Sequence, residues 1–260
     1  MAKSQTGNNK GGRWLACRPN KKGAMMIFES FASGSHANAY AVDDGKTKVL
    51  IEAGVSADRL RHFVDLSNVA GCLLTHEHKD HSKYAYSLQK SGIDVYGTYG
   101  TLEGIPGHRK REIGINGFFT VGSWNVYSFD VEHDAAQPCG YMLYSMHTKE
   151  RLLFVTDAMR IKYNFKGITH LAIEANYCEG LINQLTSTDH FKRVYSSHLS
   201  VQAAISTIKN NIEWGSLDTV FLLHLSDKNS DETLFQKRVQ DAVKRPVYVC
   251  PRDDYMRIGF

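Results

Sequence analysis

The sequence lacks the features that mark several classes of protein. Its five cysteines form no CxxC pair and are odd in number, which argues against a disulfide framework and favours a reducing compartment. No apolar run reaches the length of about 18 residues that a membrane span requires. The N-terminus also lacks the apolar centre of a secretory signal. We therefore expect a cytoplasmic protein that makes no membrane contact.

Internal repeats and an obvious interdomain linker are absent as well, so we expect one domain over residues 25–260. A hydrophobic content of 42% supplies enough apolar material for a sizeable core. Residues 1–24 hold six lysines and arginines and no acid, whereas the whole chain carries a net charge of only +4. We interpret residues 1–24 as a disordered basic tail in preference to a nucleic-acid contact, which leaves the domain itself slightly acidic.

The pattern of apolar residues predicts strands first and a strand–helix alternation later. Short apolar runs broken by glycine, serine and aspartate fill residues 25–55 and are typical of a meander. Later strands are predicted over 69–75, 93–98, 124–133, 140–146, 151–157, 169–176 and 218–226, and helices over 56–66, 80–92, 200–211 and 231–243. This order indicates an α/β domain with two sheets and helices outside them.

The stretch CLLTHEHKDHSKY, residues 72–84, follows an apolar strand with an unusual density of titratable side chains. A histidine-rich surface loop would explain such a stretch, and so would a metal site. His76, His78, Asp80 and His81 offer four donors within six residues, between a strand end and a helix. Alternate residues His76 and His78 can point to one ion, and Asp80 and His81 can face a second.

Three further donors decide between these interpretations. His133, Asp157 and His224 each lie where an apolar strand runs out, and side chains there are positioned firmly by the sheet. Five histidines and two carboxylates are sufficient for two ions that share one aspartate. The sequence therefore predicts a dinuclear metal centre, of the kind that hydrolyses phosphodiesters.

The run THEHKDH resembles the signature of the metallo-β-lactamase fold, and the downstream donors follow in the order of that fold. Further stretches resemble blocks of its YycJ/WalJ-type branch over about residues 25–250, namely FASGSHANAY, LIEAG, EHDAAQPCGY, EANYCEGLI, SSHLSVQAA and LLHLSDKN. The resemblance implies a four-layered αββα sandwich and a metal-dependent exonuclease that acts on DNA.

The resemblance also assigns roles to individual residues. One metal would be held by His76, His78 and His133, and the other by Asp80, His81 and His224, with Asp157 bridging the two. His198 corresponds to a histidine beside the scissile phosphate, where it can protonate the leaving oxygen. We count His198 and Asp80 as the catalytic residues.

This chain departs from the family pattern at two places. Glu52 stands where the family has aspartate, and we expect it to brace the histidine loop as a hydrogen-bond acceptor behind the ligands. The block that the family writes ESNH is EANY here, at residues 174–177, which affects substrate preference. Candidates for substrate contact are His36, Asn176 and Tyr177; the alternatives are a plain loop histidine for the first and strand-end packing for the others.

The expected function is that of a dinuclear phosphodiesterase, most simply a DNA exonuclease in which a hydroxide bridging two divalent ions, Zn²⁺ or Mn²⁺, attacks phosphorus. The alternatives are a cyclic-nucleotide phosphodiesterase that degrades a phage-defence signal, and an ester or thioester hydrolase on the same fold. The partner is thus a nucleic-acid or nucleotide substrate, and the fold family makes a homodimer an expectation. Basic side chains that could line a rim for phosphates are Lys79, Lys83, Lys90, Arg109, Lys110 and Arg111.

Overall fold

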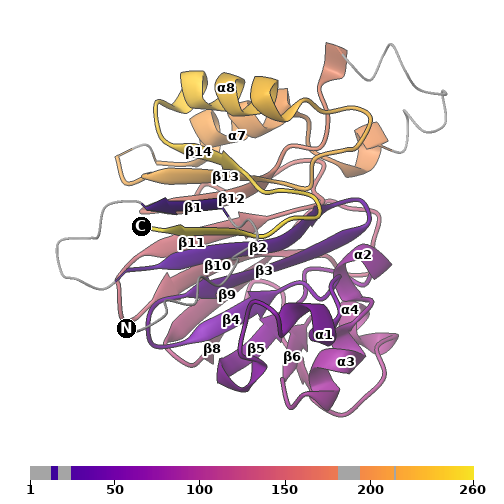
Figure 1. Cartoon of the computed structure of the whole chain (residues 1–260). Helices are drawn as coiled ribbons and strands as arrows, with labels where there is room; N and C mark the ends of the chain where they lie inside the picture. The colour runs from indigo at the N-terminus through magenta and orange to yellow at the C-terminus, as the bar shows by residue number, and fades with distance from the viewer. Residues whose placement is uncertain (1–12, 17–24, 181–193, 214) are drawn as a thin grey trace, which may run out of the picture.

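The computed structural model describes residues 13–16, 25–180, 194–213 and 215–260 (Figure 1). Its described residues form two β-sheets. In the order of their hydrogen bonding, the first sheet consists of β1 (Arg13–Ala16), β15 (Met256–Gly259), β2 (Ile27–Gly34), β3 (Ala37–Asp43), β4 (Lys48–Ile51), β5 (Val69–Leu73), β6 (Val95–Gly97) and β7 (Lys110–Glu112). The second consists of β14 (Val247–Val249), β13 (Thr219–Leu223), β12 (His170–Glu174), β11 (Arg151–Val155), β10 (Cys139–Ser145), β9 (Trp124–Asp130) and β8 (Phe118–Val121).

Apart from the parallel pair of β1 and β15, each sheet has an antiparallel half and a parallel half. Strands β4 to β7 run parallel to one another, as do β11 to β14. Because the carboxyl ends of parallel strands meet at one edge of a sheet, the loops that leave β4 and β5 come together, and so do those that leave β11, β12 and β13. These two groups of loops hold most of the predicted ligands.

The core between the sheets is built from large side chains that interleave. Phe28 of β2 stacks on Phe221 of β13 with ring centroids 4.3 Å apart, and Tyr40 of β3 meets Phe154 of β11 edge-on at 5.3 Å. These four rings are fully buried. Burying a side chain of this size stabilises the fold by about 1.5–3 kcal/mol, so each pair contributes strongly to holding the sheets face to face.

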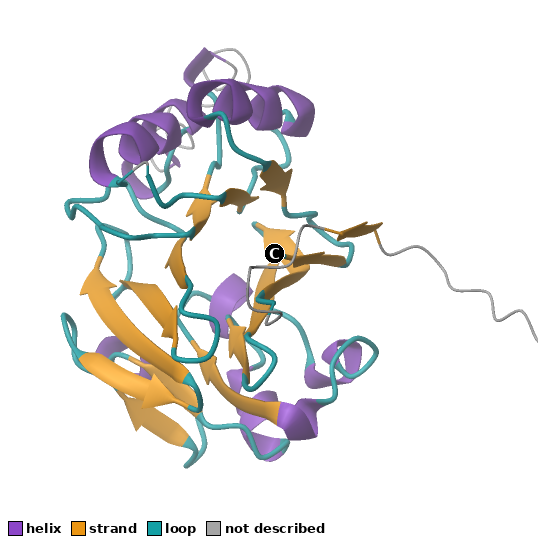
Figure 2. Cartoon of the chain, turned by 90° about the vertical axis from the view of Figure 1, so that its left-hand side faces the viewer, coloured by secondary structure: helices purple, strands orange, loops and turns teal. Residues whose placement is uncertain are grey.

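Helices pack against part of the outer face of each sheet (Figures 1 and 2). The first sheet carries the short helices α1 (Ala57–Leu60), α2 (Lys79–Ser82), α3 (Ala85–Lys90) and α4 (Tyr99–Glu103), with the 3₁₀ turn η1 (Leu66–Asn68). The second sheet carries the longer helices α7 (Val201–Asn211) and α8 (Glu232–Val243), which bury Ile208, Phe235 and Val239 against it. The predicted α/β sandwich of four αββα layers is confirmed.

The helix predicted over residues 80–92 is wrong as a single element. Helix α2 ends at Ser82 and α3 begins at Ala85, because the Tyr84 amide donates to the carbonyl of Ala53 at 2.9 Å instead of continuing the helix. The stop at Gly92 is confirmed: its φ of 89° lies in the left-handed region that ends helices. The break ties the ligand-bearing turn α2 to the end of β4.

Strand β1 lies within residues 1–24, where the sequence predicted a disordered tail. It pairs in parallel with β15, with Arg13 opposite Met256 and Ala16 opposite Gly259, so that its backbone groups complete the edge of the sheet. Residues 13–16 are thus paired in the structure, and for residues 1–12 and 17–24 the predicted disorder lies outside the described residues and stays a prediction. Among the described residues, no helix has the length and apolar character needed to cross a membrane.

Candidate metal centre

The predicted ligands meet at the loop edge of the sandwich, where the backbone is bent sharply. Glu52, Asp157 and His224 follow β4, β11 and β13 within one or two residues, and all three adopt positive φ angles of 67°, 46° and 52°. A left-handed conformation costs a non-glycine residue about 1–2 kcal/mol. The tertiary fold holds this strain at the site, and it turns each side chain from its strand toward a common point.

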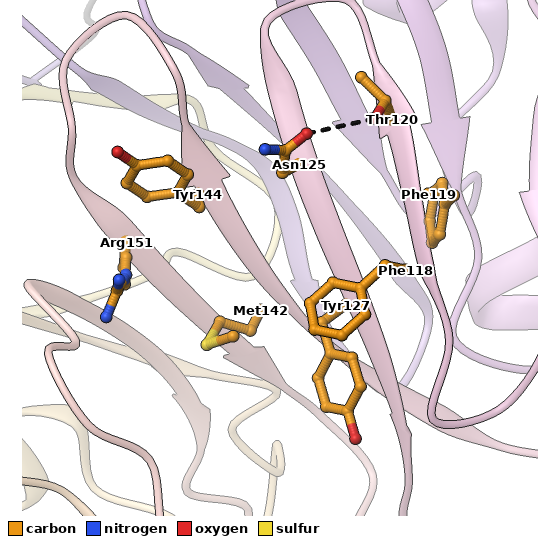
Figure 3. A pocket seen from close by; sticks show the side chains of 8 residues that line it. All are labelled: Phe118, Phe119, Thr120, Asn125, Tyr127, Met142, Tyr144 and Arg151. Carbon is orange, nitrogen blue, oxygen red and sulfur yellow. Dashed lines mark hydrogen bonds between the residues drawn. The ribbon is translucent and has the colours of Figure 1, made fainter.

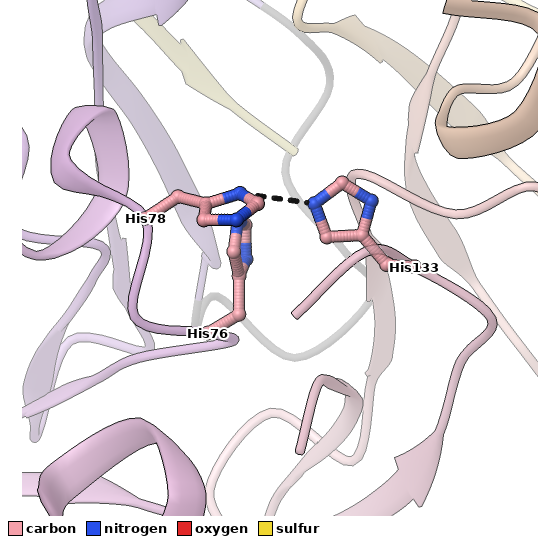
Figure 4. A group of neighbouring side chains, drawn as sticks. All are labelled: His76, His78 and His133. Carbon is pink, nitrogen blue, oxygen red and sulfur yellow. Dashed lines mark hydrogen bonds between the residues drawn. The ribbon is translucent and has the colours of Figure 1, made fainter. Parts of the chain in front are cut away.

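His76, His78 and His133 form the first ligand set, and their donor atoms lie within 4.8 Å of one another (Figure 4). His133 Nε2 lies 3.2 Å from His78 Nδ1, and a dashed line joins the two rings in Figure 4. His133 Nδ1 lies 2.9 Å from the carbonyl oxygen of Ser197, so it carries the proton and donates it there. That tautomer leaves Nε2 of His133 free for a metal.

His76 is set in its tautomer by a chain of hydrogen bonds that begins at Glu52. The Thr75 hydroxyl donates to Glu52 Oε1 at 2.6 Å, and the hydroxyl oxygen lies 2.8 Å from His76 Nδ1. Because the hydroxyl proton is already committed, His76 Nδ1 donates to that oxygen and Nε2 faces the centre. Glu52 Oε1 also lies 3.4 Å from His81 Nδ1, so one carboxylate supports both ligand sets, in the role that the sequence predicted for it.

Asp80, His81 and His224 form the second ligand set. Asp80 Oδ2 lies 3.2 Å from His81 Nε2 and 3.3 Å from His224 Nε2. Asp157 lies between the sets: its Oδ2 is 2.6 Å from His81 Nε2 and 3.8 Å from His76 Nε2, and its Oδ1 is 3.5 Å from His224 Nε2. All seven predicted ligands are thus brought together, with Asp157 placed to be shared.

The charges of the centre suit divalent cations. Burial alone would raise the pKa of the Asp157 carboxyl, but the imidazoles of His224 and His81 outweigh it and hold that pKa well below the usual range. Burial lowers the pKa of His76, with His81 adding to the effect, which keeps His76 in the neutral form that binds metals. Both Asp157 oxygens are buried, with imidazole nitrogens as their polar neighbours. A buried carboxylate among imidazole nitrogens is a donor set that fits Zn²⁺ or Mn²⁺.

Glu174, at the end of β12, is a site residue that the sequence analysis missed. Its Oε1 lies 2.6 Å from Nδ1 of His198, and its Oε2 accepts from the amides of Leu199 and Ala158, both at 3.1 Å. His198 Nδ1 also lies 3.0 Å from Asp157 Oδ1. Burial lowers the pKa of His198, but the Glu174 carboxylate and then Asp157 outweigh it and raise that pKa to about 10. His198 is therefore oriented and charged by two carboxylates beside the second ligand set.

Two asparagines lie behind the second ligand set. Asn38 of β3, which the sequence analysis did not single out, places Nδ2 3.1 Å from His81 Nε2 and 3.3 Å from Asp80 Oδ2. Asn176 Nδ2 donates to the carbonyl of His224 at 2.9 Å and lies 3.0 Å from His224 Nδ1. Both asparagines are buried, and Asn176 supports a predicted ligand, whereas contact between Asn176 and substrate stays a prediction.

The other two candidates for substrate contact have partners other than the predicted ligands. The His36 side chain is 83% exposed and pairs with Asp227 at 3.3 Å. Tyr177 is buried against Val194, and its carbonyl accepts from the amide of Val201 at the start of α7. Tyr177 therefore packs at the strand end, which was the alternative interpretation, and contact between His36 and substrate stays a prediction.

A hollow of about 500 Å³ on the outer face of the second sheet is separate from this centre (Figure 3). It is lined by Phe118, Phe119, Thr120, Asn125, Tyr127, Met142, Tyr144 and Arg151. None of these side chains is a histidine, cysteine or carboxylate, so the hollow offers no metal donor of the kind found at the loop edge.

The fold and the donor set define a metal-dependent hydrolase with a metallo-β-lactamase fold, and comparisons with known proteins agree. Residues 47–210 match the family model described as the beta-lactamase superfamily domain, and the chain belongs to this family. It is 33% identical over 170 residues to the exodeoxyribonuclease YycJ of Bacillus anthracis, covering 58% of this chain and 63% of that relative. It is 27% identical over 233 residues to the exodeoxyribonuclease WalJ of Streptococcus pneumoniae, covering 80% and 84%.

A solved structure shows the same fold. The metallo-β-lactamase fold protein YhfI of Bacillus subtilis superposes with a TM-score of 0.70 at 13% identity, over 90% of this chain and 99% of that one. The resemblance to the metallo-β-lactamase fold and to its YycJ/WalJ-type branch is thus confirmed, as is the prediction of a metal-dependent hydrolase.

Proposed function

We propose that this chain is a dinuclear-metal phosphodiesterase that removes nucleotides from DNA ends. The observation that carries the proposal is the pair of ligand sets that share Asp157, with His198 held beside them. The similarity to relatives named exodeoxyribonucleases supports DNA as the substrate. When bound, two divalent ions supply an activated water and neutralise the negative charge that develops on the phosphate.

The chain itself contributes a proton donor and the groups that orient it. His198 donates from Nδ1 to Glu174, which leaves Nε2 as the ring atom that can exchange a proton with substrate. Cleavage of a phosphodiester breaks a phosphorus–oxygen bond, and the departing oxygen needs a proton as its charge grows. We assign that transfer to His198 Nε2, with Glu174 stabilising the charged imidazolium before transfer.

Two exposed lysines next to the ligands favour a polyanionic substrate. Lys79 and Lys83 lie on and directly after α2, and both are exposed. Two other predicted members of the rim are engaged elsewhere, since Arg109 and Arg111 each contact Asp94 at 2.9 Å. We therefore narrow the phosphate-contacting rim to the lysines of α2.

The test is hydrolysis by metal-reconstituted protein of 5′-labelled single- and double-stranded DNA, RNA and a panel of cyclic mononucleotides, with His81→Ala as the control. Stepwise loss of nucleotides from DNA, dependent on Mn²⁺ or Zn²⁺ and absent in the variant, would support the proposal. Turnover of a cyclic nucleotide with no action on polymers would contradict it. Hydrolysis confined to carbon esters or thioesters would contradict phosphodiester chemistry altogether.

A further inference from the structure

The loop of residues 131–138, called here the His133 loop, joins β9 to β10 and brings one ligand of the first set from the second sheet. Its partners His76 and His78 come from the first sheet, after β5. The distance between these ligands therefore depends on how the His133 loop is fixed against the other half of the sandwich. Nothing in the local sequence of either segment sets that distance.

Glu77, which lies between the ligands His76 and His78 in the chain, fixes one point of the His133 loop. Its Oε1 accepts from the amide of Ala136 at 2.8 Å. Its own backbone carbonyl accepts from the Ser82 hydroxyl at 2.6 Å, which holds Glu77 against α2. A single side chain thus connects the segment that carries two ligands to the loop that carries the third.

Gln137 fixes a second point, against the start of α4. Its Oε1 accepts from the Gly100 amide at 3.1 Å, and its carbonyl accepts from the Thr98 hydroxyl at 2.7 Å. The two segments touch so closely that a Cβ atom built on Gly100 would lie 2.8 Å from Gln137 Cβ and 3.1 Å from Ala136 Cβ. Glycine at position 100 is therefore required for this contact.

The N-terminal end of the His133 loop is fixed by hydrogen bonds to segments that belong to the second half of the sandwich. The Met159 amide donates to the carbonyl of Glu132 at 2.8 Å, and His133 itself donates to the carbonyl of Ser197. With both ends held, the His133 ring has little freedom to move relative to His76 and His78.

The side-chain hydrogen bonds of Glu77 and Gln137 do not involve the second ligand set. The side-chain hydrogen bonds of Glu77 and Gln137 run to Ala136 and Gly100, whereas Asp80 hydrogen-bonds to Asn38 and His224. A change at Glu77 or Gln137 therefore acts on the first ligand set and leaves the partners of the second in place.

We propose that Glu77 and Gln137 are positioning residues that set the metal affinity of the first ligand set alone. The proposal rests on the two-ion centre of the proposed function. Without the Glu77 carboxylate, the Ala136 amide loses its acceptor and the His133 loop loses a tie to the first sheet. Groups that orient metal ligands in this way typically change affinity by about 10–100-fold when they are removed.

The experiment is a calorimetric titration of the metal-stripped full chain with Zn²⁺, repeated with Co²⁺ while the visible absorption of the bound ion is followed. His78→Ala and Asp80→Ala identify which binding step belongs to the first and second ligand sets. We expect Glu77→Ala to weaken the first step about 10–100-fold, to change its Co²⁺ spectrum and to leave the second step unchanged. Glu77→Gln keeps an acceptor oxygen for Ala136 and should restore the first step.

Gln137→Ala and Gly100→Ala apply the same test from the other anchor of the loop, and remain informative if Glu77→Ala does not fold. Asp58→Ala serves as the control, since the Asp58 side chain is exposed and pairs with Arg61. Wild-type affinity at both steps in Glu77→Ala and Gln137→Ala would overturn the proposal, and so would equal weakening of both steps. A wild-type chain that binds two ions and trims no DNA would contradict the proposed function and leave this inference intact.

Discussion

At the scale of single residues, the centre depends on groups that hold ligands as much as on the ligands. Glu52 reaches His76 through the Thr75 hydroxyl, and it also lies close to His81. Glu174 does the same for His198. In each case a buried carboxylate fixes which ring nitrogen carries the proton, and so which nitrogen is left to face metal or substrate.

Replacing Glu174 by Gln should lower the turnover of DNA about 100-fold or more, because His198 loses the anion that stabilises its charged form. The stoichiometry of bound metal should stay unchanged, since none of the seven predicted ligands is altered. Single-turnover kinetics and metal analysis measure the two effects. Glu179→Gln is the matched control, since Glu179 is exposed and accepts a hydrogen bond from the Ser200 hydroxyl. Wild-type turnover in Glu174→Gln would show that the Glu174–His198 pair plays no part in hydrolysis.

A second residue-scale prediction concerns His170, which is buried at the start of β12, with its ring centroid 3.9 Å from that of Phe260. Burial lowers its pKa, although Glu150 opposes the shift. The unfolded chain therefore takes up a proton near pH 6.5 that the folded chain does not, so stability is complete above this pH and falls below it. The ceiling for one such group is about 1.4 kcal/mol per pH unit.

His170→Phe should abolish this contribution, so that its free energy of unfolding declines less than that of the wild type between pH 7 and pH 5. Urea denaturation at several pH values measures the difference. His62→Phe, at an exposed histidine, is the control for the loss of an imidazole. If the free energy of unfolding declines equally with pH in the wild type and in His170→Phe, His170 does not contribute to the pH dependence of stability.

At the scale of elements, α2 combines two roles in four residues. It presents Asp80 and His81 to the centre and leaves the side chain of Lys79 in solvent, with exposed Lys83 directly after it. The element can do both because it is cut short at Ser82, where the chain turns to bond the end of β4. In a longer helix the Tyr84 amide would bond within the helix, and the tie to Ala53 would be lost.

Replacing Lys79 and Lys83 by alanine should weaken DNA binding at low salt, because each lysine that meets a phosphate releases a counterion. The slope of log affinity against log salt should fall by about 1 for each lysine–phosphate pair that the substitutions remove, or about 2 for the double variant. Fluorescence anisotropy with labelled DNA over a salt series measures this slope. Lys90→Ala is the control, since Lys90 lies at the end of α3 over the Tyr86 ring. An unchanged slope in the double variant would place the phosphates elsewhere.

At the scale of the whole molecule, the sheets are tied at the end away from the metal centre by Asp44, in the turn between β3 and β4. Asp44 Oδ2 accepts from the hydroxyls of Ser123 and Ser145, both at 2.7 Å, and Oδ1 accepts from the Thr47 amide at 2.8 Å. Ser145 ends β10 of the second sheet, and Ser123 lies in the turn between β8 and β9 of the same sheet. Although burial opposes the shift, these hydrogen bonds lower the pKa of Asp44.

Asp44→Ala should therefore destabilise the chain by about 3 kcal/mol at neutral pH, since a buried charged acceptor of several hydrogen bonds is lost. The ionised Asp44 carboxylate stabilises the folded chain fully above the pKa of an unfolded aspartate. This stabilisation is lost as the pH falls through the lower pKa that Asp44 has in the folded chain. Chemical denaturation measures the change, and the neighbouring Asp43→Ala should cost less than about 1 kcal/mol. Equal losses in the two variants would remove any special role for Asp44.

The sequence by itself predicted seven candidate ligands and an α/β fold of two sheets. It could do so because metal donors at strand ends have a recognisable spacing, and because buried strands and amphipathic helices leave periodic patterns. Its resemblance to the metallo-β-lactamase fold added the full division of these candidates into two sets and the four layers. The same resemblance indicated Glu52 behind the ligands, at a position where the family has aspartate.

Only the tertiary structure decided which groups stand behind the ligands. Glu174 meets His198 across 24 residues of chain and Asn38 meets Asp80 across 42, and a lone carboxylate or amide at a strand end looks the same whether or not it has such a partner. The break between α2 and α3 and the strand β1 were hidden for a related reason. Each depends on a backbone hydrogen bond to a distant segment, and local propensity contains no record of that segment.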